Sequence, residues 1–178
     1  MNKLILILIF FFTSVEIFAQ SISDLDEKNG YKDLSFSLPL ETIIKKTNAK
    51  LQGWLSTKEL DCYTIRNSEY EKFGNFSGTI LLFKSKKDTL IHTIYFSDNK
   101  KGASEFKELI LFFESLYGPE SDKDNYNYTY TWKGVKVQLV LSYDYIEEKT
   151  SIDIVNLEAE SRYQEEKEKV RNKTKNEF

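Results

Sequence analysis

Few residues in this chain could do catalytic chemistry, because its 178 residues include one histidine and one cysteine. A serine or cysteine nucleophile needs a base, and His92 is the only imidazole that could serve. Leu90, His92 and Ile94 alternate along a predicted strand, which favours a structural histidine on an apolar face. Cys62 has no second cysteine to pair with, and its apolar neighbours predict a buried thiol. The sequence therefore gives no catalytic residue and no cofactor, and favours a protein that is not an enzyme.

Carboxylates offer two further kinds of chemistry, and the spacing supports neither. A carboxylate pair could hydrolyse a glycosidic bond, but no candidate acid stands at a spacing that singles it out. Those candidates are Glu69, Glu71, Asp144, Glu147, Glu148 and Asp153. Asp122-Lys123-Asp124 begins like a calcium loop, yet Tyr126 fills the fifth position and Asn127 stands where glycine is needed. Asp24 and Asp26 fail similarly, so we interpret both pairs as turn and solvation residues and predict no metal site.

An aromatic run is the most specific feature of the sequence. Tyr126, Tyr128, Tyr130 and Trp132 alternate with polar residues, which predicts a strand with all four rings on one face. If that face is exposed, the rings form a platform for a sugar or an extended peptide. If it packs under the helix predicted over residues 103–117, the rings are core, and the polar opposite face favours this second alternative. These four residues are the candidate binding residues.

The hydrophobic periodicity predicts an α+β fold built from two units of the same order. Each unit is a helix followed by three strands: residues 39–53 then 61–67, 73–83 and 89–97, and residues 103–117 then 126–132, 135–143 and 150–156. We expect one antiparallel sheet of about six to seven strands with the two main helices on one face. Residues 20–157 form the single domain, and its first ten residues are expected to be polar and loose.

The two ends of the chain predict export and a charged tail. Residues 1–19 resemble a secretory signal peptide, with Lys3 before an apolar run over residues 4–12 and Ala19 at the cut. That run is far shorter than the roughly 20 residues that span a bilayer as a helix. The mature chain is therefore expected in the periplasm or outside the cell, without a transmembrane span. Residues 158–178 mix acidic and basic side chains and predict a solvated helix or a disordered tail.

Composition excludes several classes of protein. Lysine and arginine total 25 against 28 acidic residues, a formal net charge of -3, which lacks the basic excess of a nucleic-acid binder. Hydrophobic residues at 40% and aromatic residues at 15% are too frequent for a disordered chain. The remaining classes are a protein-binding module, a glycan- or small-ligand-binding module and a weak carboxylate-based hydrolase.

Short motifs resemble those of small exported proteins of the Bacteroidota, which are largely uncharacterised. The motifs are Asn29-Gly30-Tyr31-Lys32-Asp33, Pro39-Leu40-Glu41, Ile94-Tyr95-Phe96 and Leu116-Tyr117-Gly118-Pro119. The duplicated helix-then-strands order also resembles the fold group of β-lactamase-inhibitor proteins and outer-membrane-assembly lipoproteins, although this chain lacks the lipid-bearing cysteine of the lipoprotein branch. This resemblance implies a non-catalytic protein that binds another envelope or extracellular protein. The alternative is a glycan- or small-ligand-binding module, or a weak carboxylate-based hydrolase, that uses the aromatic strand face.

Overall fold

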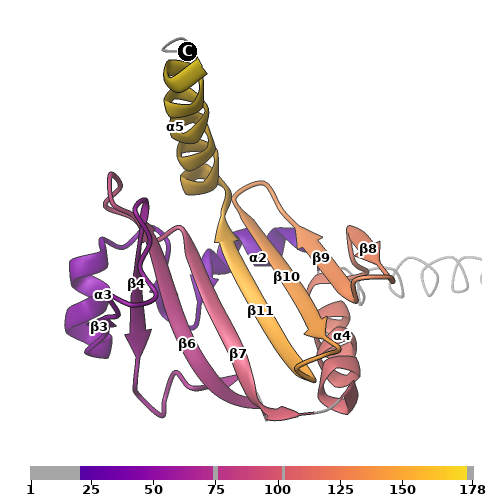
Figure 1. The fold of residues 1–178 in the computed structure, drawn as a ribbon. Coiled ribbons are helices and arrows are strands. Elements are labelled where there is room, and N and C mark those ends of the chain that lie inside the picture. The colour runs from indigo at the N-terminus through magenta and orange to yellow at the C-terminus, as the bar shows by residue number, and fades with distance from the viewer. Residues whose placement is uncertain (1–20, 74–75, 102, 176–178) are drawn as a thin grey trace, which may run out of the picture.

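Strands rich in apolar residues form one large antiparallel sheet, which Figure 1 shows face-on. This computed structural model describes residues 21–73, 76–101 and 103–175, and the predicted signal peptide lies outside them. Within the described residues the sheet has nine strands, eight of them in the order β3-β4-β6-β7-β11-β10-β9-β8, with β5 paired to β6. They are β3 (Lys50–Leu51), β4 (Leu60–Ile65), β5 (Lys72–Phe73), β6 (Phe76–Ser85), β7 (Thr93–Lys101), β8 (Asp122–Asp124), β9 (Thr129–Lys133), β10 (Val137–Asp144) and β11 (Lys149–Asn156).

The two predicted units meet at the centre of the sheet. The last strand of the first unit, β7, pairs with the last strand of the second, β11, so that Ile94 lies opposite Ile154. The α+β class, the antiparallel sheet and the order of helix before strands in each unit are confirmed. Among the described residues the sheet has nine strands instead of the expected six to seven, because the short strands β3, β5 and β8 add to it. A further hairpin, β1 (Gly30–Tyr31) with β2 (Leu34–Ser35), forms a separate two-stranded sheet that is not paired with the large one.

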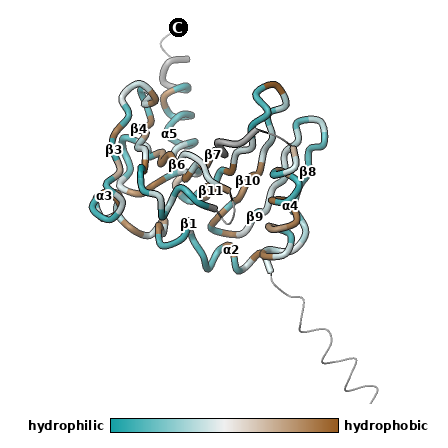
Figure 2. Tube along the Cα trace, turned by 90° about the horizontal axis from the view of Figure 1, so that it is seen from below, coloured by the Kyte–Doolittle hydropathy of each residue, from teal (hydrophilic) through white to brown (hydrophobic). Residues whose placement is uncertain are grey.

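Helices α2 (Ile22–Lys28), α3 (Leu40–Thr47) and α4 (Ala103–Tyr117) lie on one side of the sheet, whereas α5 (Leu157–Lys175) projects from the other (Figure 2). Helix α3 is shorter than predicted because Asn48 adopts a left-handed conformation that ends it. Helix α4 matches the predicted range and is followed by Gly118 with a φ of 79°. No helix among the described residues is long and apolar enough to span a membrane.

The core lies between the sheet and these three helices. One face of each central strand is buried, and α4, which buries Phe106, Leu109 and Phe113, packs against β10 and β11. The sheet contributes Ile80, Leu82, Ile94, Phe96, Leu139, Leu141, Ile152 and Ile154. The other face, towards the viewer in Figure 1, carries smaller and more polar side chains that are half-buried. This division follows from the period of two along each strand.

The expectation that residues 20–29 are loose was wrong. They contain α2, which buries Leu25 in the core and is fastened to the β9–β10 turn by Asp26. The carboxylate of Asp26 accepts backbone N–H groups from Val135, Lys136 and Val137 at 2.7, 2.8 and 2.9 Å. Burial alone would raise the pKa of Asp26, but these hydrogen bonds outweigh it and the pKa is lowered. Asp26 therefore holds α2 against the β9–β10 turn and is not only a solvation residue. We name its three hydrogen bonds the Asp26 clasp.

The charged tail forms α5, and its first turns dock on the first unit. Ala159 is buried, and two N–H groups of Arg162 donate to one carboxylate oxygen of Asp88 at 2.9 and 2.7 Å. The hydroxyl of Tyr163 donates to Glu59 at 2.7 Å. Beyond residue 166 the described side chains of α5 are exposed. The first half of this helix is therefore fixed by contacts, and the second half is solvated as predicted.

Candidate functional site

The predicted aromatic strand face is divided between the core and the surface. Strand β9 begins only at residue 129, and residues 125–128 form the β8–β9 turn, in which Tyr128 has a φ of 50°. Trp132 is fully buried and its indole donates to the Gly118 carbonyl at 2.9 Å, while Tyr130 packs edge-on against Phe106. Tyr126 is 89% exposed and Tyr128 is 43% exposed. Each of the two alternatives therefore describes one half of the run.

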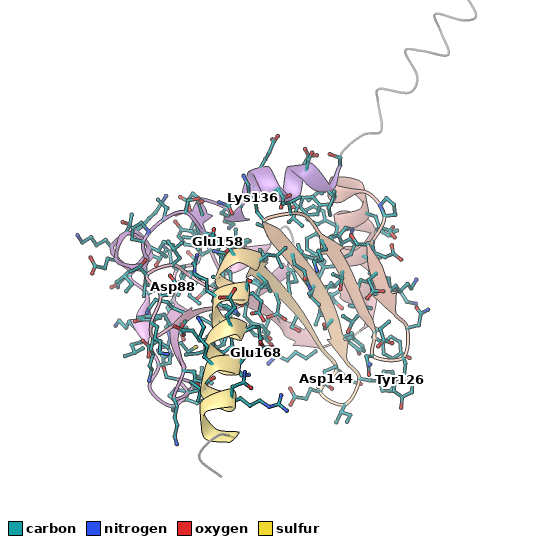
Figure 3. All side chains as sticks on the ribbon, turned by 90° about the horizontal axis from the view of Figure 1, so that it is seen from above. Asp88, Tyr126, Lys136, Asp144, Glu158 and Glu168 are labelled. Carbon is teal, nitrogen blue, oxygen red and sulfur yellow. The ribbon has the colours of Figure 1, made fainter. Side chains whose placement is uncertain are left out.

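The exposed half joins a second turn to form an apolar end of the molecule. Tyr145 and Ile146, in the β10–β11 turn, are 72% and 95% exposed. The ring of Tyr145 stacks on that of Tyr128 with centroids 6.0 Å apart, and Tyr143 meets both rings edge-on. Figure 3 shows Tyr126 beside Asp144, at the same end of the strands. We name Tyr126, Tyr128, Tyr145 and Ile146 the aromatic tip.

Two aspartates hold these turns in shape. The carboxylate of Asp124 accepts the backbone N–H groups of Tyr126 and Asn127 at 2.9 and 3.1 Å. The backbone hydrogen bond from Asn127 is the main reason why the pKa of Asp124 is lowered. Asp144 accepts the backbone N–H groups of Ile146 and Glu147 at 2.8 and 3.0 Å. Such hydrogen bonds from a side chain to the backbone of its own turn fix the backbone that presents the rings.

The aromatic tip stands in an acidic environment. The two turns and the adjoining ends of the four strands that they connect carry five exposed acidic residues, Asp122, Asp124, Asp144, Glu147 and Glu148, against the two lysines Lys123 and Lys149. The ammonium of Lys123 lies 4.7 Å from the Tyr130 ring centre, and the hydrogen bond with Tyr130 raises the pKa of Lys123. The turns and strand ends that carry the rings therefore have a net negative charge.

Sequence reasoning missed Tyr145 and Ile146. The available signal was an apolar pair inside a segment otherwise made of acidic turn residues, Asp144-Tyr145-Ile146-Glu147-Glu148. Large apolar side chains in a polar turn have no core to enter, because the chain reverses there at the end of the sheet. The sequence has no complete calcium loop at Asp124, and in the structure the carboxylate of this residue stabilises the β8–β9 turn.

The histidine and the cysteine considered for catalysis are both buried. His92 is buried, with Nδ1 2.7 Å from the Thr93 hydroxyl and Nε2 in contact with Glu160 of α5. Although His92 is buried, its predicted place on the apolar face of a strand was wrong, because β7 begins only at Thr93 and the imidazole contacts α5. Cys62 is fully buried as predicted, and burial raises the pKa of its thiol to about 11.

Asp153 is the candidate acid with the most altered environment. It lies on the more polar face of the sheet, between Tyr95 on β7 and Val140 on β10, and burial raises its pKa to about 6. Glycosidase chemistry needs a second carboxylate or a positioned base. The residues directly opposite Asp153 supply neither. Across residues 21–73, 76–101 and 103–175, no group of three or more histidine, cysteine or acidic residues could hold a metal ion.

The geometry thus provides an exposed aromatic surface whose two turns are held by Asp124 and Asp144. The chain matches no protein-family model, no curated protein and no solved structure.

Proposed function

We propose that this is an exported, non-catalytic protein that binds another protein of the envelope or the extracellular space through its aromatic tip. The observation that carries the proposal is the exposure of three tyrosines and one isoleucine on two adjoining turns. Exposed apolar groups gathered in one place mark interaction sites more often than scattered ones do. Tyrosine is also enriched among the residues that dominate the binding energy of protein interfaces.

The surroundings of the aromatic tip support a protein partner with a basic surface. Ile146 offers no hydroxyl or amide for a sugar, whereas an apolar pocket on a protein can enclose it. The acidic side chains around the rings, of which Glu147 and Glu148 are examples, would attract lysine and arginine and speed encounter. A basic partner with an apolar centre satisfies both features.

A pull-down with matched variants tests the proposal. The purified protein and a Tyr126→Ser/Tyr145→Ser variant are used as bait against envelope extract and culture medium, with a Trp54→Ser variant as control. Trp54 is 81% exposed and lies in the β3–β4 connection, by the edge of the sheet opposite β8. We expect one protein that is captured by the wild type and the control and lost with the double variant.

Two results would contradict the proposal. One is a captured protein that the double variant retains, which would place the binding surface elsewhere. The other is capture of no protein while soluble envelope oligosaccharides bind the wild type and not the double variant, which would make the aromatic tip a sugar platform. Circular dichroism of all three proteins checks that the exposed substitutions leave the fold intact.

A further inference from the structure

A pocket on the helix side of the sheet is separate from the aromatic tip. It has a volume of about 400 Å³ and lies where α2, α4 and the β1 strand approach β10 and β11. This volume is within the range of roughly 300–1,000 Å³ that is typical of small-molecule sites. Its apolar wall is formed by Leu25, Tyr31, Phe112, Leu116, Leu139 and Ile154.

The polar groups of the pocket are mostly cationic. Lys28, Lys32 and Lys72 line it together with a single acid, Asp24. The carboxylate of Asp24 already accepts the backbone N–H of Ser21 at 3.1 Å. In a chain whose net charge is -3, three lysines against one acid make a locally positive site.

The three lysines differ in how they are held. The ammonium of Lys32 donates to the Glu69 carbonyl and lies 5.4 Å from the Tyr31 ring centre, so its position is fixed. Within the part of the chain that the structure describes, Lys28 and Lys72 form no ion pair, and both are exposed. Their ammonium groups can therefore turn towards an anion at the rim.

Tyr117 adds a neutral hydrogen-bond donor to the same pocket. Burial, and to a lesser extent the charge of Asp24, raises the pKa of its hydroxyl, which therefore keeps its proton at neutral pH. Its ring stacks on Phe113 in the core, which fixes the direction of the side chain. A neutral donor beside mobile ammonium groups suits the oxygens of a carboxylate.

We propose that this pocket binds a small amphipathic carboxylate, whose acyl chain enters the apolar wall and whose head group meets Lys28 and Lys72. Charge complementarity selects an anion, and the six apolar wall residues select a ligand with a hydrocarbon chain. The pocket uses none of the residues of the aromatic tip, so the failure of one proposal does not affect the other.

Calorimetric titration of the purified protein with dodecanoate tests this assignment, with dodecanol as the uncharged probe and acetate as the probe without a chain. We expect one dodecanoate per chain and no detectable binding of acetate. A Lys28→Gln/Lys72→Gln variant should bind dodecanoate at least about fivefold more weakly, from two exposed charge interactions of ordinary strength. Dodecanol should show the same affinity for the wild type and this variant.

Two further variants locate the binding. Lys107→Gln removes an exposed lysine of α4 that does not line the pocket and should leave dodecanoate affinity unchanged. Leu116→Trp places a larger ring at the wall and should abolish binding. Because Leu116 is only half-buried, we expect that variant to fold, and circular dichroism checks this.

The assignment is overturned if dodecanoate does not bind. It is also overturned if the lysine pair and Lys107 variants weaken binding equally, since the effect would then be general charge attraction. A second copy of the chain could also fill an apolar pocket, and light scattering tests this by measuring whether the protein is a dimer. A dimer that dissociates in the Leu116→Trp variant would show that a protein surface fills the pocket.

Discussion

At the scale of single residues, Asp153 shows how a sheet face can alter one side chain. The residue lies on the central strand β11 with Tyr95 and Val140 directly opposite on the two neighbouring strands. These neighbours remove water from the carboxylate and supply no cation, so burial raises its pKa to about 6. The folded protein therefore favours the protonated acid, and ionisation near neutral pH costs stability.

The consequence is a specific pH dependence. The pKa of Asp153 is higher in the folded than in the unfolded chain, so its contribution to stability is complete below about pH 4 and is lost as pH rises through about 6. We expect Asp153→Asn to raise the unfolding free energy at pH 7 by about 1–3 kcal/mol relative to wild type. Urea unfolding of both proteins from pH 4 to 7 measures this difference.

Because other groups titrate in the same window, the difference between the two proteins is the decisive quantity. It should be small near pH 4 and grow towards pH 7. A difference that is constant over this range would show that Asp153 has an ordinary pKa and that the substitution acts only through packing.

At the scale of elements, α2 depends on one long-range clasp. Asp26 accepts three backbone N–H groups from residues 135–137, more than 100 positions away in the sequence. Gly134 belongs to the same contact, because a Cβ there would lie 2.3 Å from a carboxylate oxygen of Asp26. The clasp holds the helix that forms one wall of the pocket.

Removing the clasp should loosen α2. We expect Asp26→Ala to lower the unfolding free energy by about 1–3 kcal/mol at pH 7, because three donors lose a charged acceptor. The neighbouring exposed acid gives the control, and Glu27→Ala should change stability by less than about 0.5 kcal/mol. Urea unfolding compares the three proteins, and equal stability of the Asp26 variant and the control would contradict this role.

The clasp is also pH-dependent in the opposite sense to Asp153. Since the pKa of Asp26 is lowered in the fold, its contribution is present above the unfolded-state pKa and is lost as the pH falls through the folded-state value. The stability difference between wild type and Asp26→Ala should therefore shrink in acid. A difference that grows in acid would contradict the assignment of the clasp to the carboxylate.

The elements also show which parts of this structure a sequence can predict. Helix α4 and strands β4, β6, β10 and β11 lie close to their predicted ranges, because their apolar periods agree with their burial. Strand β7 was predicted over residues 89–97 and runs over Thr93–Lys101.

Helix α2 buries little more than Leu25, and its fastening by Asp26 depends on a distant turn. The local signal was Asp24 three residues after Ser21, the spacing of a capping box, with Asn29 at the C-cap.

The candidate site was predicted only in part, for a related reason. Alternation of tyrosines over residues 126–132 fits a strand, but Asp124 captures the backbone of Tyr126 and Asn127 and turns the chain instead. Tyr145 and Ile146 belong to the aromatic tip because the β10–β11 turn lies beside the β8–β9 turn. That proximity depends on the order of strands in the sheet, which no local pattern gives.

At the scale of the whole molecule, the features separate onto different sides of one sheet. The aromatic tip lies where β8–β9 and β10–β11 turn, the lysine-lined pocket lies among the helices, and α5 projects from the other side (Figures 1 and 2). Under the two proposals, this separation would let a protein partner engage the aromatic tip while the pocket holds a ligand. The rigid core between them keeps both surfaces in fixed positions.

The most direct test of the central proposal is site-specific photo-cross-linking in the native organism. A photoreactive phenylalanine analogue replaces Tyr126 in one strain, Tyr145 in a second and the exposed Trp54 in a third. We predict that positions 126 and 145 cross-link to the same protein, with a basic surface, and that position 54 does not. Cross-links to that protein from position 54 alone, or no protein cross-link from positions 126 and 145, would contradict binding through the aromatic tip.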